Sequence, residues 1–177
     1  DTKIIWTIYI RSLAQTRSLG DDYAMAKAAT AYQLFPKDET IFSLYRMLTY
    51  GQQRMVEAEN FNVQATEAYN NKDFATAASL FQQAFDLDPL QHTYSLNAGL
   101  GYYEAKQYDK AIQLFDLALT SKNETTKERA LRFKGISLYA AGRAPEACAV
   151  FLRLKNKYTK RMYEQEFRKY CFGENNN

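Results

Sequence analysis

Apolar side chains in the second half of this chain recur at the spacing of one face of an α-helix. The same group returns three times, as Ala77, Phe81 and Ala84, then Ala111, Phe115 and Ala118, then Ala147, Phe151 and Leu154. The first two copies lie 34 residues apart and the last two lie 36 apart. This period is typical of helix pairs that cannot bury their apolar faces alone and therefore stack on one another. The pattern predicts an all-α chain of stacked helix pairs.

Turn residues divide this region into three predicted helix pairs. Asp73 and Phe74 mark the turn inside the first pair, and Pro89 ends that pair because proline cannot continue a helix. In the third pair, Gly142 suits a left-handed turn and Pro145 suits the first turn of a helix. The predicted pairs are 59–71 with 75–87, 95–105 with 109–121, and 127–140 with 145–155.

Residue size also repeats from one pair to the next. Small residues face each other within each predicted pair, as Ala65 with Ala77, Gly99 with Ala111, and Gly135 with Ala147. A larger side chain at these positions would push the two helices of a pair apart. Phe81, Phe115 and Phe151 are expected to fill the space between successive pairs. These positions are therefore predicted to form the core.

Three segments carry the pattern most clearly: AYNNKDFATAASLFQQAFDLDP, GYYEAKQYDKAIQLFDLAL and GISLYAAGRAPEACAVFLRL. They resemble the tetratricopeptide repeat family over about 58–160, although Phe61, Ser95 and Leu131 stand where such repeats often begin with Trp. The resemblance implies a right-handed α-solenoid of stacked antiparallel helix pairs. It also implies a concave wall, lined by the first helix of each pair, that normally holds another protein.

The resemblance implies a single solenoid domain, 1–177, of about nine or ten helices with a C-terminal capping helix. Ser12, Ala24, Ala31 and Pro36 have the spacing of one more, degenerate repeat. The predicted units are a degenerate repeat at 4–38, a linking helix at 39–57, repeats at 58–91, 92–125 and 128–159, a capping helix at 160–172, and a disordered tail at 173–177.

The segment after the degenerate repeat has room for one helix. Asp38 suits its N-cap, and an apolar stripe follows at Ile41, Phe42, Tyr45, Leu48 and Met55. Two arrangements fit this pattern. In one, an unpaired linking helix spans 39–50; in the other, the helix continues almost without a break into the first clear repeat, with a bend or stop at Gly51.

The predicted capping helix faces the last repeat with Met162, Phe167 and Cys171. Cys171 and Cys148 are the two cysteines of the chain. If the cap folds back on the last repeat, they approach each other and a disulfide is possible. The favoured interpretation is two buried free thiols that behave as small hydrophobic side chains.

Charge is unevenly distributed along the chain, whose net charge is +3. Residues 1–120 hold 10 Lys and Arg against 14 Asp and Glu, whereas 121–177 hold 13 against 6. Within the second part, one predicted turn is surrounded by Arg153, Lys155, Lys157, Lys160 and Arg161. This cluster is interpreted as a solvated helix end with cations near the C-terminal dipole. The alternative is a surface for acidic peptides, nucleic acid or an anionic membrane.

Catalytic and metal-binding chemistry finds little support in the sequence. The single histidine, His92, lies between two repeats and is expected at the surface. No cluster of His and Cys has the spacing of metal ligands, and no glycine-rich phosphate loop is present. Asp86 and Asp88 precede Pro89 at a common spacing that carries no specific signal. We therefore predict no enzyme, no cofactor and no bound metal.

The hydropathy of the chain and its first residue are the two sequence features that relate to the cellular location of the protein. No run approaches the roughly 18 apolar residues of a membrane-spanning helix. The sequence opens on Asp1 in place of Met, which favours a bacterial extracytoplasmic location, in the periplasm or attached to a membrane. A cytoplasmic location is the alternative.

Aligning the three repeats places tyrosines at equivalent sites of the first helices: Tyr69, Tyr103 and Tyr139. Tyrosine offers a large contact area with little side-chain entropy to lose, and a hydroxyl for a peptide backbone. Packing alone is the competing explanation for tyrosine at this site. The predicted groove joins these tyrosines to Asn62, Thr66, Leu96, Asn97, Leu100, Arg129, Arg132 and Ile136.

One subtype of the family grips the C-terminal carboxylate of heat-shock chaperones through five polar positions. Asn97 and Arg129 match two of them, whereas Asn62, Thr66 and Phe133 stand at the other three. Chaperone-tail binding is therefore not predicted. The mixture of apolar and cationic residues favours a peptide that carries acidic and hydrophobic side chains.

The sequence as a whole predicts a non-enzymatic protein–protein interaction module that scaffolds or recruits a partner of unknown identity. The partner would supply a peptide or helix to the concave groove. One alternative is nucleic-acid or anionic-surface binding through the basic C-terminal third, with nucleic acid not favoured. Another is a regulatory or assembly domain of a larger enzyme or membrane complex.

Overall fold

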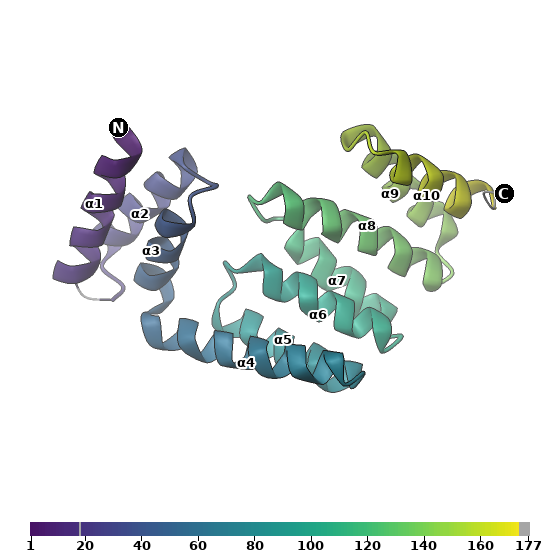
Figure 1. Ribbon diagram of the computed structural model, residues 1–177, viewed down its shortest axis with the longest axis horizontal. Coiled ribbons are helices and arrows are strands. Elements are labelled where there is room, and N and C mark those ends of the chain that lie inside the picture. The colour runs from purple at the N-terminus through teal and green to yellow at the C-terminus, as the bar shows by residue number, and fades with distance from the viewer. Residues whose placement is uncertain (18, 174–177) are drawn as a thin grey trace.

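A computed structural model describes residues 1–17 and 19–173 of the chain (Figure 1). These residues form ten α-helices and no strand, which confirms the predicted all-α solenoid. The predicted tail from 174 onwards lies outside the described residues. The helices are α1 Thr2–Thr16, α2 Asp22–Leu34, α3 Glu39–Tyr50, α4 Gln52–Asn70, α5 Phe74–Leu87, α6 His92–Glu104, α7 Tyr108–Ala118, α8 Glu124–Ala140, α9 Ala144–Lys157 and α10 Arg161–Phe172.

Helices α4 to α10 form an array in which each helix packs on the next (Figure 1). The predicted core positions are buried here, and Phe115 and Phe151 are fully enclosed. The small residues are needed for close packing: a Cβ added at Gly99 would lie 2.6 Å from the Phe115 ring, and one at Gly135 would lie 3.0 Å from the Phe151 ring. The sequence pattern missed Gly101, where an added Cβ would lie 2.9 Å from the Cα of Ala78 in α5.

The turns inside the three helix pairs share one backbone feature. Lys72, Lys106 and Gly142 stand at equivalent positions, and their φ angles are 63°, 59° and 79°. Only glycine adopts this left-handed region without a steric cost. The left-handed turn could therefore be predicted from the sequence at Gly142, but not at the two lysines.

Helices α1 to α3 form a separate packing unit, here called the N-terminal unit. Its core contains one apolar cluster, formed by Ile10, Leu13, Ala24, Ala28, Ala31, Ile41 and Leu48. Helix α3 has the range expected for a linking helix at 39–50, but it is not unpaired, because Ile41 and Leu48 pack in this cluster. The helix does stop at Tyr50, where Gly51 has a φ of 84° and donates its N–H to the Met47 carbonyl. Helix α4 then begins at Gln52, well before the predicted start near 59.

Polar side chains join the N-terminal unit to the array. Arg46 of α3 donates its Nε–H to Asp88 Oδ2 at 2.7 Å, and its terminal NH2 group bonds the same oxygen. Asp88 is fully buried, and its Oδ1 has no hydrogen-bond partner among the residues that the structure describes. Within the array, Arg54 of α4 donates to the Asp86 carbonyl of α5 at 3.3 Å. Asp88, which carried no signal in the sequence, therefore lies at the joint between the two parts.

Helix α10 caps the end of the array. Cys148 of α9 and Cys171 of α10 form a disulfide, with Cα atoms 5.2 Å apart, so the expectation of two free thiols is wrong. Tyr170 stacks on Phe151 with ring centroids 4.5 Å apart. Met162, predicted on the apolar side of the cap, is 40% exposed, and its neighbour Tyr163 is buried instead. Tyr163, Phe167 and Tyr170 of α10 face the array, and their rings cover the last helix pair.

Candidate peptide-binding surface

The first helices of the three pairs, α4, α6 and α8, follow one another along the near side of the array in Figure 1. Tyr94 of α6 donates its hydroxyl to Glu59 of α4 at 2.8 Å. Helices α6 and α8 are in direct contact. The exposed positions of these three helices are here called the first-helix surface.

The predicted groove residues differ in how accessible they are. Thr66, Arg129 and Tyr139 are exposed. Partly buried positions are Asn62, Tyr69, Asn97, Leu100, Tyr103, Arg132 and Ile136. Leu96 is fully buried in a core cluster with Phe115, so it is not available to a ligand. The prediction that Leu96 lines the groove is wrong, because this side of α6 faces the interior of the array.

The three equivalent tyrosines each pack against another aromatic ring. Tyr69 meets Phe74 edge-on at 5.2 Å between centroids, and Tyr103 meets Tyr108 at 5.8 Å. Ala144 occupies the corresponding place in the third pair, and Tyr139 instead meets Tyr170 of the cap at 4.9 Å. Packing therefore orients all three rings.

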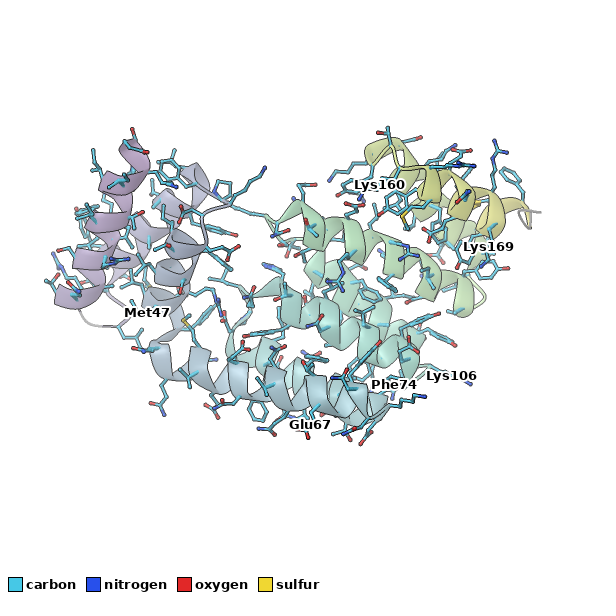
Figure 2. The ribbon with its side chains drawn as sticks, in the orientation of Figure 1. Met47, Glu67, Phe74, Lys106, Lys160 and Lys169 are labelled. Atoms are coloured by element: carbon cyan, nitrogen blue, oxygen red, sulfur yellow. A yellow bond between two sulfur atoms is a disulfide. The ribbon has the colours of Figure 1, made fainter. Side chains whose placement is uncertain are left out.

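The rings of these tyrosines pack against neighbours, whereas their hydroxyl groups form no hydrogen bond within the described residues. Burial raises the pKa of both Tyr69 and Tyr103 above the ordinary value of 10.0. Within residues 1–17 and 19–173, no hydroxyl of this column has a hydrogen-bond partner. Figure 2 labels Phe74 and Lys106, which both lie at the end of the array where the turns inside the pairs are found. The tyrosine column thus follows this edge of the first-helix surface.

The two predicted groove arginines are not equivalent. Arg132 donates its Nε–H to Glu166 of α10 at 2.7 Å, and this bond raises the pKa of the guanidinium above its ordinary value. Arg129 is exposed and makes no ion pair within the described part of the chain. Arg129 is therefore an exposed cation that the first-helix surface offers to a ligand.

Most cations of the basic C-terminal third lie next to a carboxylate, and some share one. Lys155, Lys157 and Lys160 of the predicted cluster pair with Glu164, Glu124 and Glu128. Further pairs join Lys127, Arg132, Lys134, Arg143 and Arg168 to nearby carboxylates. Lys160 and Lys169 mark the two ends of α10 in Figure 2. Because these cations already have acidic neighbours, the positive charge is dispersed among ion pairs.

Neither a metal site nor a membrane span emerges from residues 1–17 and 19–173. No group of three His, Cys, Asp or Glu side chains there is placed to hold a metal ion. None of the helices is both long enough and apolar enough to cross a membrane.

Comparison with known proteins agrees with the packing of the array. Residues 62–124 match the family model described as Tetratricopeptide repeat, and they cover the C-terminal part of α4 together with α5, α6 and α7. This segment is similar to tetratricopeptide repeats. Repeats of this family are protein–protein interaction modules.

Two solved tetratricopeptide repeat structures are similar in fold. One is the N-terminal domain of stress-induced protein-1 (STI-1) from C. elegans, with a TM-score of 0.59 and 20% identity, covering 66% of this chain and 96% of that one. The other is the first TPR of Spaghetti (RPAP3), solved bound to the HSP90 peptide SRMEEVD, with a TM-score of 0.59 and 17% identity. The match covers 67% of this chain and 94% of that one. At these identities the likeness concerns the fold.

Three of the five positions that correspond to the carboxylate clamp bond or pack against other residues of this chain. Asn62 donates its amide to Glu59 at 3.1 Å, and Thr66 donates its hydroxyl to the Asn62 carbonyl at 2.8 Å. Phe133 stacks on Phe115 with centroids 6.2 Å apart. These three side chains therefore lack the free cationic groups that a carboxylate clamp uses.

Proposed function

We propose that this protein recruits a partner by binding a peptide or helix on the first-helix surface. The proposal assigns no catalytic role to the chain. It concerns the partly buried and exposed positions of α4, α6 and α8 described above, without Leu96. The remaining groove residues share one side of the array with the tyrosine column.

One observation carries the proposal: the rings of Tyr69, Tyr103 and Tyr139 are held by aromatic neighbours while their hydroxyls remain unpartnered within the described residues. A fixed ring loses little conformational freedom when a ligand binds. An unpartnered hydroxyl can accept or donate a hydrogen bond to an extended backbone. The column is therefore suited to contact several successive residues of one peptide.

Neighbouring side chains define the chemistry of the ligand. Leu100 and Ile136 are partly exposed apolar residues, Asn97 supplies an amide, and Arg129 supplies an exposed cation. A peptide with hydrophobic side chains and at least one carboxylate complements this surface. The peptide bound by RPAP3, SRMEEVD, combines such residues. We do not assign HSP90 as the partner, because the clamp positions of this chain differ.

Selection from a random peptide library displayed on phage tests the proposal. Selected peptides should be enriched in acidic and apolar residues and should bind the wild-type protein by fluorescence anisotropy. The variant Tyr69→Phe/Tyr103→Phe/Tyr139→Phe keeps the ring packing and removes the hydroxyls. Loss of these hydrogen bonds should weaken binding about tenfold.

A matched control changes three exposed residues of the second helices, Gln83→Ala, Gln113→Ala and Arg153→Ala. This variant should bind the selected peptides as the wild type does. Circular dichroism should show the same helix content in all three proteins. Equal affinity of the wild type and the tyrosine variant, or equal losses in the two variants, would mean that the ligand binds elsewhere.

A further inference from the structure

A cavity of about 440 Å³ lies where the N-terminal unit meets the array. Its walls come from the end of α2 and the start of α3, from the start of α6, and from the start of α8. Figure 1 shows the turn between α2 and α3 facing the starts of α6 and α8. The volume is typical of ligand pockets, which span roughly 300–1,000 Å³. This junction cavity is separate from the tyrosine column, which follows the opposite ends of α6 and α8.

One wall of the junction cavity is aromatic. The rings of Tyr32 and Phe42 line it and stack on each other, with centroids 4.9 Å apart and planes inclined by 25°. Both rings are partly buried, and burial raises the pKa of Tyr32 above 10.0. Tyr32 therefore stays neutral at physiological pH, and the face of its ring is an electron-rich surface.

The charged side chains of the cavity are mostly acidic. Asp38, Glu39 and Glu124 line it, against the single cation Lys37. Hydrogen bonds from backbone N–H groups, that of Ile41 first, lower the pKa of Asp38 below 3.8. Bonds from Lys157, Lys127 and Tyr158 lower the pKa of Glu124 to about 2. Both carboxylates are ionised at neutral pH and already paired, Asp38 with Lys3 and Glu124 with Lys127 and Lys157. Glu39 makes no ion pair within the described residues, so it is the carboxylate of the cavity that an added cation can approach.

An ammonium group of the chain itself lies over the Tyr32 ring, although its residue does not line the cavity. Lys122, in the loop between α7 and α8, places its Nζ 4.9 Å from the centroid of the Tyr32 ring. This arrangement is a cation–π contact. Lys122 makes no ion pair within the described residues. The ring of Tyr32 therefore holds an ammonium even without a salt bridge to fix it.

We propose that the junction cavity binds the lysine side chain of a partner protein, with its ammonium beside Glu39 and the Tyr32 ring and its alkyl stem along Phe42. Lys122 then acts as an internal competitor that leaves the ring when the partner's lysine enters. The site adds a second contact, of opposite charge preference, to the first-helix surface. Its existence does not depend on the proposed function of that surface.

An NMR titration with Nα-acetyl-lysine amide tests the site, with Nα-acetyl-norleucine amide as the uncharged control of equal stem length. The lysine probe should shift the backbone amide signals of Glu39, Thr93 and Thr125 in a saturable way, and the norleucine probe should leave them in place. Lys122→Ala should tighten binding of the lysine probe about threefold, because the competing cation is gone. Glu39→Gln should weaken it by a similar factor.

Lys110→Ala is the matched control, since Lys110 lies 5.1 Å from the Tyr102 ring in the same kind of contact outside the cavity. It should leave binding unchanged. Glu39 and Lys122 are both exposed, so their variants should fold as the wild type does. Binding of norleucine amide as strongly as lysine amide overturns the proposal. Signal shifts spread over the whole surface, or unchanged affinity in Lys122→Ala, overturn it equally.

Discussion

The N-terminal unit and the array bury their apolar residues in different ways. In the N-terminal unit, three helices surround one cluster, and α2 contributes only alanines to it. In the array, clusters follow one another, so that α6 takes part in one cluster with α5 and in another with α7. Each helix pair of the array thus shares its core with the next pair. The N-terminal unit instead closes its core within itself.

This difference determines what holds the two parts together. Neighbouring pairs of the array meet backbone to backbone, as at Gly101 and Ala78. The N-terminal unit meets the array through Gly51, the buried pair of Arg46 with Asp88, and the contact of Lys122 with Tyr32. Packing fixes the array, whereas charged side chains fix the position of the N-terminal unit. Variants that remove one kind of contact and keep the other test this difference between the array and the N-terminal unit.

The largest effect is expected at the buried ion pair of the joint. Arg46→Met leaves the Asp88 carboxylate enclosed without its partner, which should lower the free energy of unfolding by about 3–5 kcal/mol. Urea unfolding followed by circular dichroism measures this loss. The double variant Arg46→Met/Asp88→Leu removes both charges and should recover most of the stability. A single variant as stable as the wild type would show that charge does not hold the joint.

The C-terminal end of the array should depend on its covalent link. The Cys148–Cys171 disulfide closes a segment with a sequence separation of 23, and removing such a link typically costs about 3 kcal/mol. Urea unfolding with and without a phosphine reductant measures the difference. Hydrogen exchange should accelerate first in α10. The variant Cys148→Ser/Cys171→Ser should match the reduced wild type and should not respond to the reductant.

Within the array, two glycines should respond differently to the same change. Gly101→Ala places a Cβ 2.9 Å from the backbone of Ala78, so the helices must separate, at a cost of about 1–3 kcal/mol. Gly135→Ala meets only the edge of the Phe151 ring, at 3.0 Å or more. The higher helix propensity of alanine, about 1 kcal/mol, should offset most of that smaller strain. Thermal unfolding of both variants gives the ranking, and a reversed order would contradict the importance of backbone contact.

The array was predictable because its signal is local and repeated. Proline, glycine and aspartate mark helix ends, and the recurring phenylalanines identify the core without any knowledge of distant contacts. The start of α4 was placed too late because Gly51 interrupts the helix for a single residue and the helical pattern resumes at once. A local stop signal does not reveal how soon the next helix begins.

The joint between the two parts and the candidate binding surface were harder to predict from the sequence, because their contacts join residues far apart in the chain. Arg46 and Asp88 are 42 positions apart, and neither belongs to a repeated pattern. The groove was located by equivalence between repeats, which misplaced Leu96 because equivalence does not reveal which side of a helix a neighbouring pair covers. The disulfide depended on how α10 folds back, which spacing alone does not determine.

The smallest effect is expected from pH at the joint. His92, predicted at the surface, is partly buried at the start of α6, and its Nε2 lies 2.9 Å from the Thr120 hydroxyl. Burial lowers the pKa of His92 below 6.5. The unfolded chain therefore binds a proton before the folded protein does, and stability should decline as pH falls through about 6.5. The loss should level off below the folded pKa.

Urea unfolding at about pH 7.5 and about pH 5.5, on either side of the ordinary histidine pKa, measures this dependence. His92→Gln keeps a polar side chain and removes the titration, so its stability should change less over this interval. Glu124 does not interfere, because its pKa is about 2 and its contribution is lost only at lower pH. An equal decline in the wild type and the variant would assign the pH dependence to other groups. A decline confined to the wild type would show that the start of α6, where the N-terminal unit meets the array, weakens on mild acidification.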